Sequence, residues 1–279
     1  MNAKNKVVIV ACEGQHDISF ITRILHTAGF RTDTRKIKEF PMPFNSLFTG
    51  IASKMILDDR KLGYQSPNFL LPSVALVAEG KIIFLHNLNG DGRSPERAQL
   101  LASYGSLVGE DDFSKDFNYE FRFLFFFDAD EHGVQTRLTE MQNELNIEPA
   151  LTNGLIVNYG KHELGCYVYH ENETDTGVLE DILLEHFSRK SEILMRNVST
   201  FLSDNSLDAE RTRELHIING EEQRKGASKY SEKKSKVNLF GQLQFSGMNN
   251  SVIISKSDFL RKEDIEHCPQ CLAIKNMFN

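Results

Sequence analysis

Two short segments of the chain are apolar at all but one position, and both lead into acidic residues. Residues 6–11 read KVVIVA and are followed by Glu13-Gly14. Residues 121–127 read FRFLFFF and are followed by Asp128-Ala129-Asp130-Glu131. Short apolar runs rich in β-branched or aromatic residues are typical of strands buried on both faces of a sheet. The sequence therefore predicts two buried strands, each ending in carboxylates.

A helix is expected after each of these strands. In the first, Asp17 can act as the N-cap and Gly29 as the stop. Apolar residues follow at helical spacing in both segments: Ile18, Ile21, Leu25 and Ala28 in the first, and Val134, Leu138, Met141 and Leu145 in the second. The repeated strand–turn–helix order predicts an α/β fold with a mainly parallel sheet flanked by helices.

The remaining pattern predicts the elements between and after these two units. We expect strands at 35–40, 155–159, 164–170 and 252–254, a hairpin at 74–88 with its turn at 79–81, and helices within 45–57, 94–104, 178–187, 193–202 and 269–278. The predicted organisation is an α/β core at 1–170, with an insertion at about 60–118 that contains the hairpin. A mostly helical C-terminal extension, 171–279, packs on that core.

Composition narrows the class of protein. The 279 residues are 40% hydrophobic and 25% charged, with a formal net charge of -7, so there is no overall basic field that would attract nucleic acid. No apolar run reaches the roughly 18 residues of a membrane span, and the N-terminus does not read as a signal peptide. The four cysteines are scattered, which is typical of a reducing compartment. We expect a cytoplasmic protein that does not contact a membrane.

The acidic ends of the two strands are the main chemical signal. If both strands lie in one parallel sheet, Glu13 and the pair Asp128/Asp130 share its carboxyl edge, where ligands bind in such folds. Asp128 and Asp130 are one residue apart, so an extended backbone directs both side chains to one side. Converging carboxylates repel each other unless a cation is bound, and oxygen ligands suit Mg²⁺ or Mn²⁺. In the alternative interpretation, Asp130 only caps the following helix and Glu13-Gly14 is a plain turn.

The segments IVACEGQHD and FLFFFDADEHG resemble the Toprim domain. This family is shared by topoisomerases, bacterial primases, OLD-type nucleases and small ribosomal-RNA maturases. Its signature is a Glu-Gly after the first strand, matched by Glu13-Gly14, and an Asp-x-Asp after a later strand, matched by Asp128-Ala129-Asp130. The resemblance implies a Mg²⁺ site in which the two aspartates hold metal. It also implies that Glu13 acts as a general acid or base, or as a metal ligand.

A bacterial Toprim-like group related to OLD-type nucleases is the more similar subset. Its later motifs are matched by Gly177-Val178-Leu179-Glu180-Asp181-Ile182-Leu183 and by Lys236-Val237-Asn238-Leu239. The resemblance then implies catalytic roles for Glu13, Asp17 and Lys236, and a metal-ligand set of Glu13, Asp128, Asp130 and Glu180. In the alternative interpretation, Glu180 and Asp181 are ordinary solvent-facing helix residues. The chain departs from the family in the long separation between Glu13 and Asp128, which is why 60–118 is interpreted as an insertion.

A basic segment and a cysteine pair are weaker signals. Residues 224–236 contain six basic residues and one acidic residue, and Lys225, Lys229, Lys233 and Lys234 are candidates for phosphate-backbone contacts. Such a run is also typical of a plain solvated face. Cys268-x-x-Cys271 has the spacing of half a zinc site, but the sequence shows neither a second Cys pair nor a His pair nearby. We therefore expect no metal at these cysteines.

Two functions of different class fit these observations. The first is a Mg²⁺-dependent nuclease that cleaves DNA or RNA, acting in a defence system with a partner ATPase. The alternative is a non-catalytic module that binds a nucleotide or a partner protein and retains the acidic site for regulation.

Overall fold

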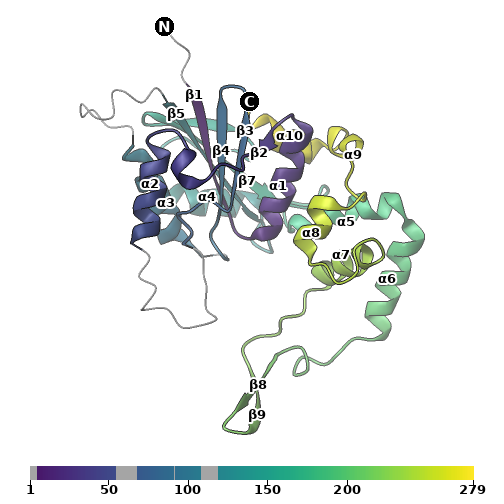
Figure 1. The fold of residues 1–279 in the computed structure, drawn as a ribbon. Coiled ribbons are helices and arrows are strands. Elements are labelled where there is room, and N and C mark those ends of the chain that lie inside the picture. The colour runs from purple at the N-terminus through teal and green to yellow at the C-terminus, as the bar shows by residue number, and fades with distance from the viewer. Residues whose placement is uncertain (1–4, 55–67, 91, 108–118) are drawn as a thin grey trace.

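A computed structural model describes residues 5–54, 68–90, 92–107 and 119–279 (Figure 1). It shows an α/β fold built on a seven-stranded mixed sheet with the order β2-β3-β4-β1-β5-β7-β6. The four strands β4, β1, β5 and β7 are mutually parallel, and the edge strands are antiparallel to their neighbours. The strands of this sheet are β1 Asn5–Cys12, β2 Arg31–Thr32, β3 Val74–Ala78, β4 Lys81–Asn87, β5 Tyr119–Asp128, β6 Ile156–Tyr159 and β7 His162–Tyr169.

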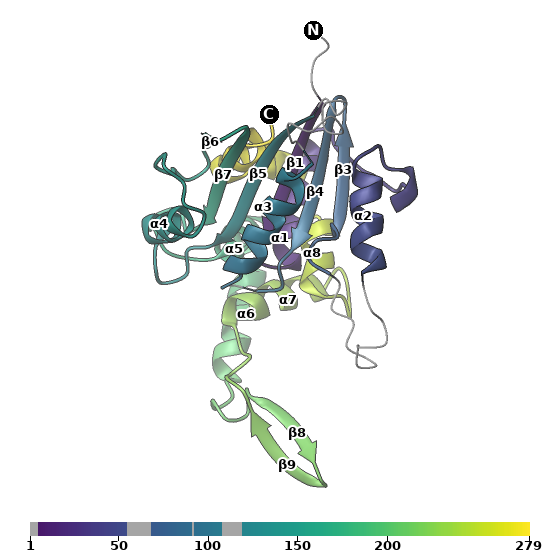
Figure 2. The same ribbon diagram turned by 90° about the vertical axis from the view of Figure 1, so that its left-hand side faces the viewer.

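Helices cover both faces of the sheet. One face carries α1 (Gln15–Thr27), α5 (Leu179–Lys190), α7 (Glu232–Gln242), α8 (Asn250–Lys256) and α10 (Pro269–Asn276). The other face carries α2 (Phe44–Ser53), α3 (Ser94–Gly105) and α4 (Val134–Glu144), and in Figure 2 α3 lies in front of the strands. The remaining elements are a 3₁₀ turn at Ile37–Glu39, α6 (Glu192–Asp204), α9 (Lys262–Glu266) and the hairpin β8 (Glu214–Ile218) and β9 (Glu221–Lys225).

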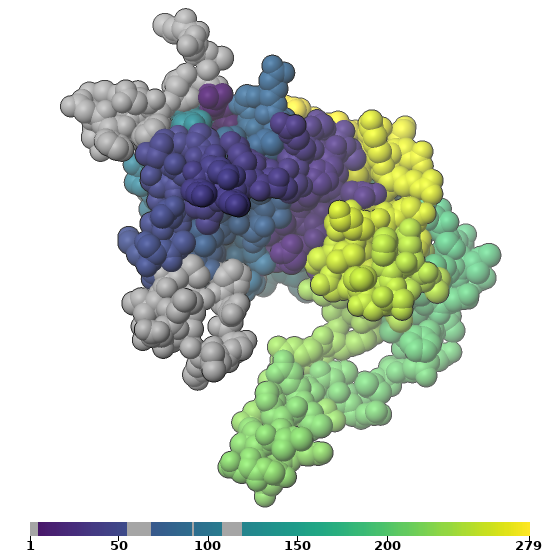
Figure 3. Space-filling view, in the orientation of Figure 1, coloured from purple at the N-terminus to yellow at the C-terminus, as the bar shows by residue number. Residues whose placement is uncertain are grey.

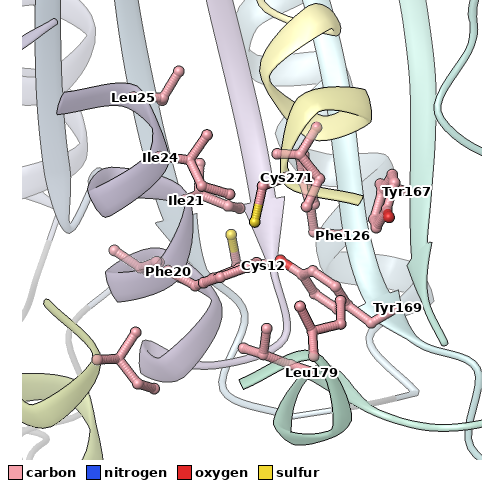
Figure 4. Packing of buried hydrophobic residues seen from close by; sticks show 14 of the residues in the cluster. Cys12, Phe20, Ile21, Ile24, Leu25, Phe126, Tyr167, Tyr169, Leu179 and Cys271 are labelled. Atoms are coloured by element: carbon pink, nitrogen blue, oxygen red, sulfur yellow. The ribbon is translucent and has the colours of Figure 1, made fainter. Parts of the chain in front are cut away.

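The alternation of side chains along β1 explains why its sequence is apolar throughout. Val8, Val10 and Cys12 belong to the core under α1, α5 and α10. Figure 4 shows Cys12 close to residues of α1 in this core. Val7, Ile9 and Ala11 belong to the core on the opposite face. Because neighbouring residues of a strand point to opposite faces, a strand covered on both sides favours apolar residues at successive positions. The prediction of a doubly covered strand is confirmed.

The hairpin predicted at 74–88 forms, with its turn at Glu79–Lys81, but it is not an appendage. Its second strand, β4, pairs in parallel with β1 along the whole length of β1, from Lys6 opposite Lys81 to Cys12 opposite Asn87. The hairpin, which lies within the segment interpreted as an insertion, is therefore an interior part of the sheet. The reason is that the parallel partner of β1 must be apolar, and β4 supplies that surface with Ile83, Phe84 and Leu85.

Two predicted strands are wrong and one hairpin was missed. The segment 35–40 contains a 3₁₀ turn, and 252–254 lies inside helix α8, with Ile253 and Ile254 facing the core. An isolated triplet of β-branched residues does not distinguish a strand from a buried helix turn. The missed hairpin, β8–β9, projects from the helical region as an arm that stands away from the body (Figure 3). Its polar, alternating sequence carries no core signal.

The C-terminal region is fastened to the sheet by polar contacts as well as by packing. The guanidinium of Arg23 on α1 donates hydrogen bonds of 2.7–3.1 Å to the carbonyls of Ser255, Ser257 and Leu260. Arg122 on β5 donates to the carbonyls of Met277 and Asn279. Residues 171–279 thus contain helices packed on the core together with the projecting hairpin. Within the described ranges, no helix has the length and apolar character that crossing a bilayer requires.

Candidate functional site

The carboxyl ends of three adjacent parallel strands open into one polar pocket. Cys12 is in register with Asn87 of β4 on one side and with Phe126 of β5 on the other. The residues that follow these strand ends therefore meet at one edge. The pocket has a volume of about 430 Å³ and is lined by Glu13, Gly14, Gln15, His16, Asp17, Asn87, Asn89, Gly90, Asp128, Leu179, Glu180 and Lys234. Glu13 and Asp128 lie at the same sheet edge, as the sequence predicts.

The turn between β1 and α1 positions Asp17. Gly14 is the N-cap of α1, and its N–H donates to Oδ2 of Asp17 at 2.8 Å. Asp17 is thus the third residue of the helix, not its N-cap as predicted, and its side chain returns to hold the start of the helix. Only 7% of Asp17 is exposed. The helix N-terminus thus holds this carboxylate beside Glu13.

Asp128, the last residue of β5, receives the first backbone N–H of α5. The N–H of Leu179 donates to Oδ1 of Asp128 at 2.8 Å. A backbone pair between Asp130 and Gly177 holds the start of α5 beside β5, with N–O distances of 2.8 and 3.0 Å. Gly177 has φ +123°, and a Cβ there would lie 2.8 Å from Asp181 Oδ2 and 2.9 Å from Glu171 N. This glycine therefore permits the close approach that delivers the Leu179 N–H to Asp128.

Glu180 follows in the first turn of α5 and points into the same pocket. It is 3% exposed, and its Oε1 lies 3.1 Å from Nδ1 of His16. The interpretation of Glu180 as a solvent-facing helix residue is therefore wrong. Burial raises its pKa, but the His16 hydrogen bond and the Lys234 charge outweigh burial, so the pKa of Glu180 lies below its usual value. Glu180 is held as a carboxylate.

The pKa values of Asp128 and Asp17 are displaced in the opposite direction. Burial raises the pKa of Asp128 to about 9, with further contributions from Asp17 and Glu13. Burial also raises the pKa of Asp17 to about 7, opposed by the Gly14 hydrogen bond and increased by Glu180. Buried carboxylates that face one another resist joint ionisation. A bound cation would favour the ionised forms, and carboxylate oxygens are the ligand type that hard divalent ions prefer.

Arg137 lies at the rim of this carboxylate group and was missed by the sequence reasoning. Its Nη2 is 3.2 Å from Oε1 of Glu13, and its Nε donates to the Asp128 carbonyl at 3.1 Å. Its guanidinium also lies 5.3 Å from the centroid of the Phe127 ring. The position of Arg137 one turn into the helix after β5 could have identified it from the sequence, because a side chain at that position points back toward the strand end.

Asp130 does not take the position predicted for it. Its φ of 49° interrupts the extended backbone, so its side chain does not lie on the same side as that of Asp128 by strand alternation. It is not among the residues lining the pocket. Nor does it cap α4, whose N-cap is Gly133. The backbone of Asp130 instead pairs with Gly177, which positions α5.

The candidate lysines separate into different places. Lys234 lines the acidic pocket. Lys236, predicted as catalytic, does not: it pairs with Glu232 at 2.6 Å and lines a different cavity beside Asp181 and Glu171. Lys236 follows Lys234 by two residues on α7, so the two side chains leave that helix on different faces. The prediction that Lys236 lies at the acidic site is therefore wrong, and Lys234 lines this pocket instead.

The other three candidate lysines lie outside the pocket. Lys233 pairs with Asp181 at 2.7 Å. Lys229 lies 3.6 Å from Glu214, and Lys225 ends β9 on the projecting arm. The basic segment is therefore not one continuous surface at the acidic site.

The strand β4 contributes residues that the sequence analysis did not single out. Asn87 and Asn89 line the pocket opposite Asp128, and the N–H of Gly90 donates to the carbonyl of Glu13 at 2.8 Å. Asn89 has φ 62°, a left-handed conformation that asparagine tolerates. Recognising β4 as the parallel neighbour of β1 would have identified these residues.

Comparison with known proteins supports the fold but not a function. No protein-family model and no curated protein sequence matches the chain. A crystal structure of a hypothetical protein from Pyrococcus horikoshii is similar, with a TM-score of 0.58 and 15% sequence identity. The similarity covers 98% of this chain and 100% of that one. At this identity the likeness shows a shared α/β fold over nearly the whole length of both chains.

Proposed function

We propose that the chain is a Mg²⁺- or Mn²⁺-dependent phosphodiesterase that cleaves nucleic acid, built on a Toprim-like sheet. The observation that carries the proposal is the convergence of four carboxylates in one pocket at the carboxyl edge of the parallel strands. Glu13 follows β1, Asp17 lies in α1, Asp128 ends β5, and Glu180 lies in α5. Buried carboxylates that face one another destabilise a fold when no cation is bound. A purely structural role therefore does not account for the convergence of these four side chains.

Each side chain of the pocket has a role that its surroundings support. Asp128, Glu13 and Glu180 would hold the metal ion, since all three line the pocket and Glu180 is already kept ionised by His16 and Lys234. When bound, the ion would offset the charge of the scissile phosphate and favour ionisation of a water molecule. Asp17 suits proton transfer, because its pKa of about 7 allows it to accept and return a proton near neutral pH. Lys234 would bind a phosphate oxygen of the substrate.

The Toprim-like identity of the sheet belongs to this proposal. It is supported by the position of Glu13-Gly14 and Asp128 at adjacent parallel strand ends and by the role of Gly177-Val178-Leu179-Glu180 in closing the pocket. The displacement of Asp130 is a departure from the Asp-x-Asp pattern. In this chain a buried glutamate from α5, Glu180, occupies the pocket with Asp128.

The test is a cleavage assay with single- and double-stranded DNA and RNA across Mg²⁺ and Mn²⁺ concentrations. Wild-type protein should cleave at least one substrate and lose activity in EDTA. Asp128→Asn and Glu13→Gln should each reduce the rate by at least about 10²-fold, because each removes a charge from the site that stabilises the transition state. The matched control is Glu131→Gln, since Glu131 is exposed in the same loop. If no metal supports cleavage, or if Glu131→Gln impairs it as strongly as Asp128→Asn, the nuclease proposal fails.

A second candidate function is favoured by one observation. Arg137 already places a guanidinium 3.2 Å from Glu13, where it offsets part of the negative charge without a metal ion. A non-catalytic module that binds a nucleotide or a partner protein could use this arrangement. It predicts no cleavage with any metal. It also predicts that Arg137→Ala weakens ligand binding, whereas in the metal-dependent enzyme the same change removes a competing cation and strengthens Mg²⁺ binding measured by calorimetry.

A further inference from the structure

A second group of metal-ligating side chains lies outside the acidic pocket. His186 of α5 meets Cys268 and Cys271 at the start of α10, with one donor atom from each within 4.8 Å of the others. All three are buried, with exposures of 4%, 4% and 0%. None of them lines the acidic pocket. The sequence alone predicts no metal here, because the third ligand comes from a distant helix that only the tertiary fold brings to the cysteine pair.

The chemistry of this group differs from that of the carboxylates. Two sulfurs and an imidazole nitrogen are softer donors that suit zinc and not Mg²⁺. Zn–S bonds of about 2.3 Å and Zn–N bonds of about 2.0 Å place neighbouring tetrahedral ligands roughly 3.5–3.8 Å apart. Donor atoms already within 4.8 Å of one another would need to approach by about 1.3 Å at most to reach that geometry.

The backbone around the cysteines provides an independent indication. The N–H of Cys271 donates to Sγ of Cys268 at 3.3 Å, which stabilises negative charge on that sulfur. Cys268 is the N-cap of α10 and Pro269 its first residue, so the helix N-terminus is directed at the same sulfur. A thiolate, and not a thiol, is the form that binds metal. The local fold therefore prepares Cys268 as a ligand.

We propose that His186, Cys268 and Cys271 bind one zinc ion that fastens α10 to α5. Asp264 of α9 interacts electrostatically with both His186 and Cys271 but lies outside the group of donor atoms within 4.8 Å, so it is the candidate for the group that orients the imidazole. Its oxygens now accept from Lys190 at 2.8 Å and from the N–H of Arg261 at 2.7 Å.

The consequence of such an ion is structural. Cys271 packs in the core over the sheet face that contains Cys12, Phe126 and Tyr167 (Figure 4). An ion at this point would hold the last helix on the sheet and, through α5, would stiffen the helix whose first turn supplies Leu179 and Glu180 to the acidic pocket. Binding to the folded state alone would raise the unfolding temperature.

The experiment measures metal content and needs no enzymatic activity. Wild-type protein purified without chelators should contain about one zinc per chain after dialysis. Cys268→Ser and His186→Gln should lose most of it, whereas Cys166→Ser, which alters a buried cysteine on β7, should keep it. Asp128→Asn should also keep it, which separates this site from the acidic pocket. Removing zinc with a strong chelator should lower the unfolding temperature of the wild type and of Cys166→Ser alike.

A second measurement on the wild type guards against variants that fail to fold. Chelator-treated wild type titrated with Co²⁺ should develop the thiolate-to-cobalt charge-transfer and visible bands of a tetrahedral sulfur-containing site, and zinc should abolish them. Folded wild type that retains no zinc and gives no such bands would overturn the proposal. So would a Cys268–Cys271 disulfide found by mass spectrometry in the freshly purified protein, which would assign the pair to redox chemistry. Either result would leave the proposed nuclease site untouched, because the cleavage assay addresses other residues.

Discussion

Replacing Asp128 by Asn should stabilise the protein when no divalent ion is present. The pKa of this carboxyl rises from 3.8 to about 9 on folding, first because it is buried and then because Asp17 and Glu13 are close. Asn cannot ionise, and its side-chain oxygen can still accept the hydrogen bond from the Leu179 N–H. The substitution therefore removes a buried carboxyl that cannot ionise at low cost and keeps the hydrogen bond from the Leu179 N–H.

The magnitude follows from proton linkage. Above pH 3.8 the unfolded carboxyl is ionised while the folded one stays protonated up to about pH 9. The folded state therefore binds more protons, and the free energy of unfolding falls as pH rises, by about 1.4 kcal/mol per pH unit for this group. Between pH 3.8 and pH 7 the loss amounts to about 4 kcal/mol at most. Asp17 also lowers the free energy of unfolding as pH rises. Its contribution levels off near pH 7, where the pKa of Asp17 in the folded state lies.

The assay is thermal and urea unfolding of wild type and Asp128→Asn in EDTA, from pH 5 to pH 9. The variant should unfold at a temperature up to about 10 °C higher at pH 7, and its stability should fall less steeply with pH. Adding Mg²⁺ should narrow this difference, because the wild type gains about 2.7 kcal/mol at a hundredfold excess over its Kd while the variant binds weakly. At a thousandfold excess the gain of about 4.1 kcal/mol should bring the two proteins to similar stability. Asp130→Asn is the matched control, since Asp130 lies outside the pocket and Asn tolerates its φ of 49°.

Two results would refute this reasoning. If Asp128→Asn unfolds at a lower temperature than the wild type in EDTA at pH 7, Asp128 is a structural residue whose ionised form is required. If both proteins lose stability with pH at the same rate, the carboxyl is not protonated in the folded state.

Three further predictions concern the loop before α5, the lysine of the pocket and an ion pair between α3 and α4. Gly177→Ala should lower the free energy of unfolding in urea by more than about 2 kcal/mol, because Gly177 has φ +123° and a Cβ there would lie 2.9 Å from Glu171 N. An unchanged midpoint of urea unfolding would show that the loop adjusts without cost. Lys234→Ala should weaken nucleic-acid binding and reduce the salt slope by about one, whereas Lys225→Ala on the arm should change neither; equal effects would mean that contact with nucleic acid extends to the arm. Arg97→Ala should lower the free energy of unfolding by about 3 kcal/mol, because the half-buried Glu144 loses its two hydrogen bonds of 2.6–2.8 Å from Arg97. A decrease below about 1 kcal/mol would mean that water replaces these hydrogen bonds.

The sequence by itself determined the parts of the fold that depend on local pattern. The run at 121–127, apolar apart from Arg122, predicted a strand covered on both faces, and β5 is such a strand. Helical spacing after Glu13 and after Asp130 identified α1 and α4. These local elements place Glu13 and Asp128 together only if both strands lie in one parallel sheet, and the parallel pairing of β1 with β5 meets that condition.

Only the tertiary structure decided which polar residues complete each site. The backbone pair between Asp130 and Gly177 turns Asp130 away from the predicted role and brings Glu180 into the pocket. Arg137 meets Glu13, and His186 meets Cys268, across long separations that no local pattern encodes. Periodicity records which face of an element is buried, because burial follows local geometry. It does not record which buried faces meet, because that depends on the packing of the whole chain.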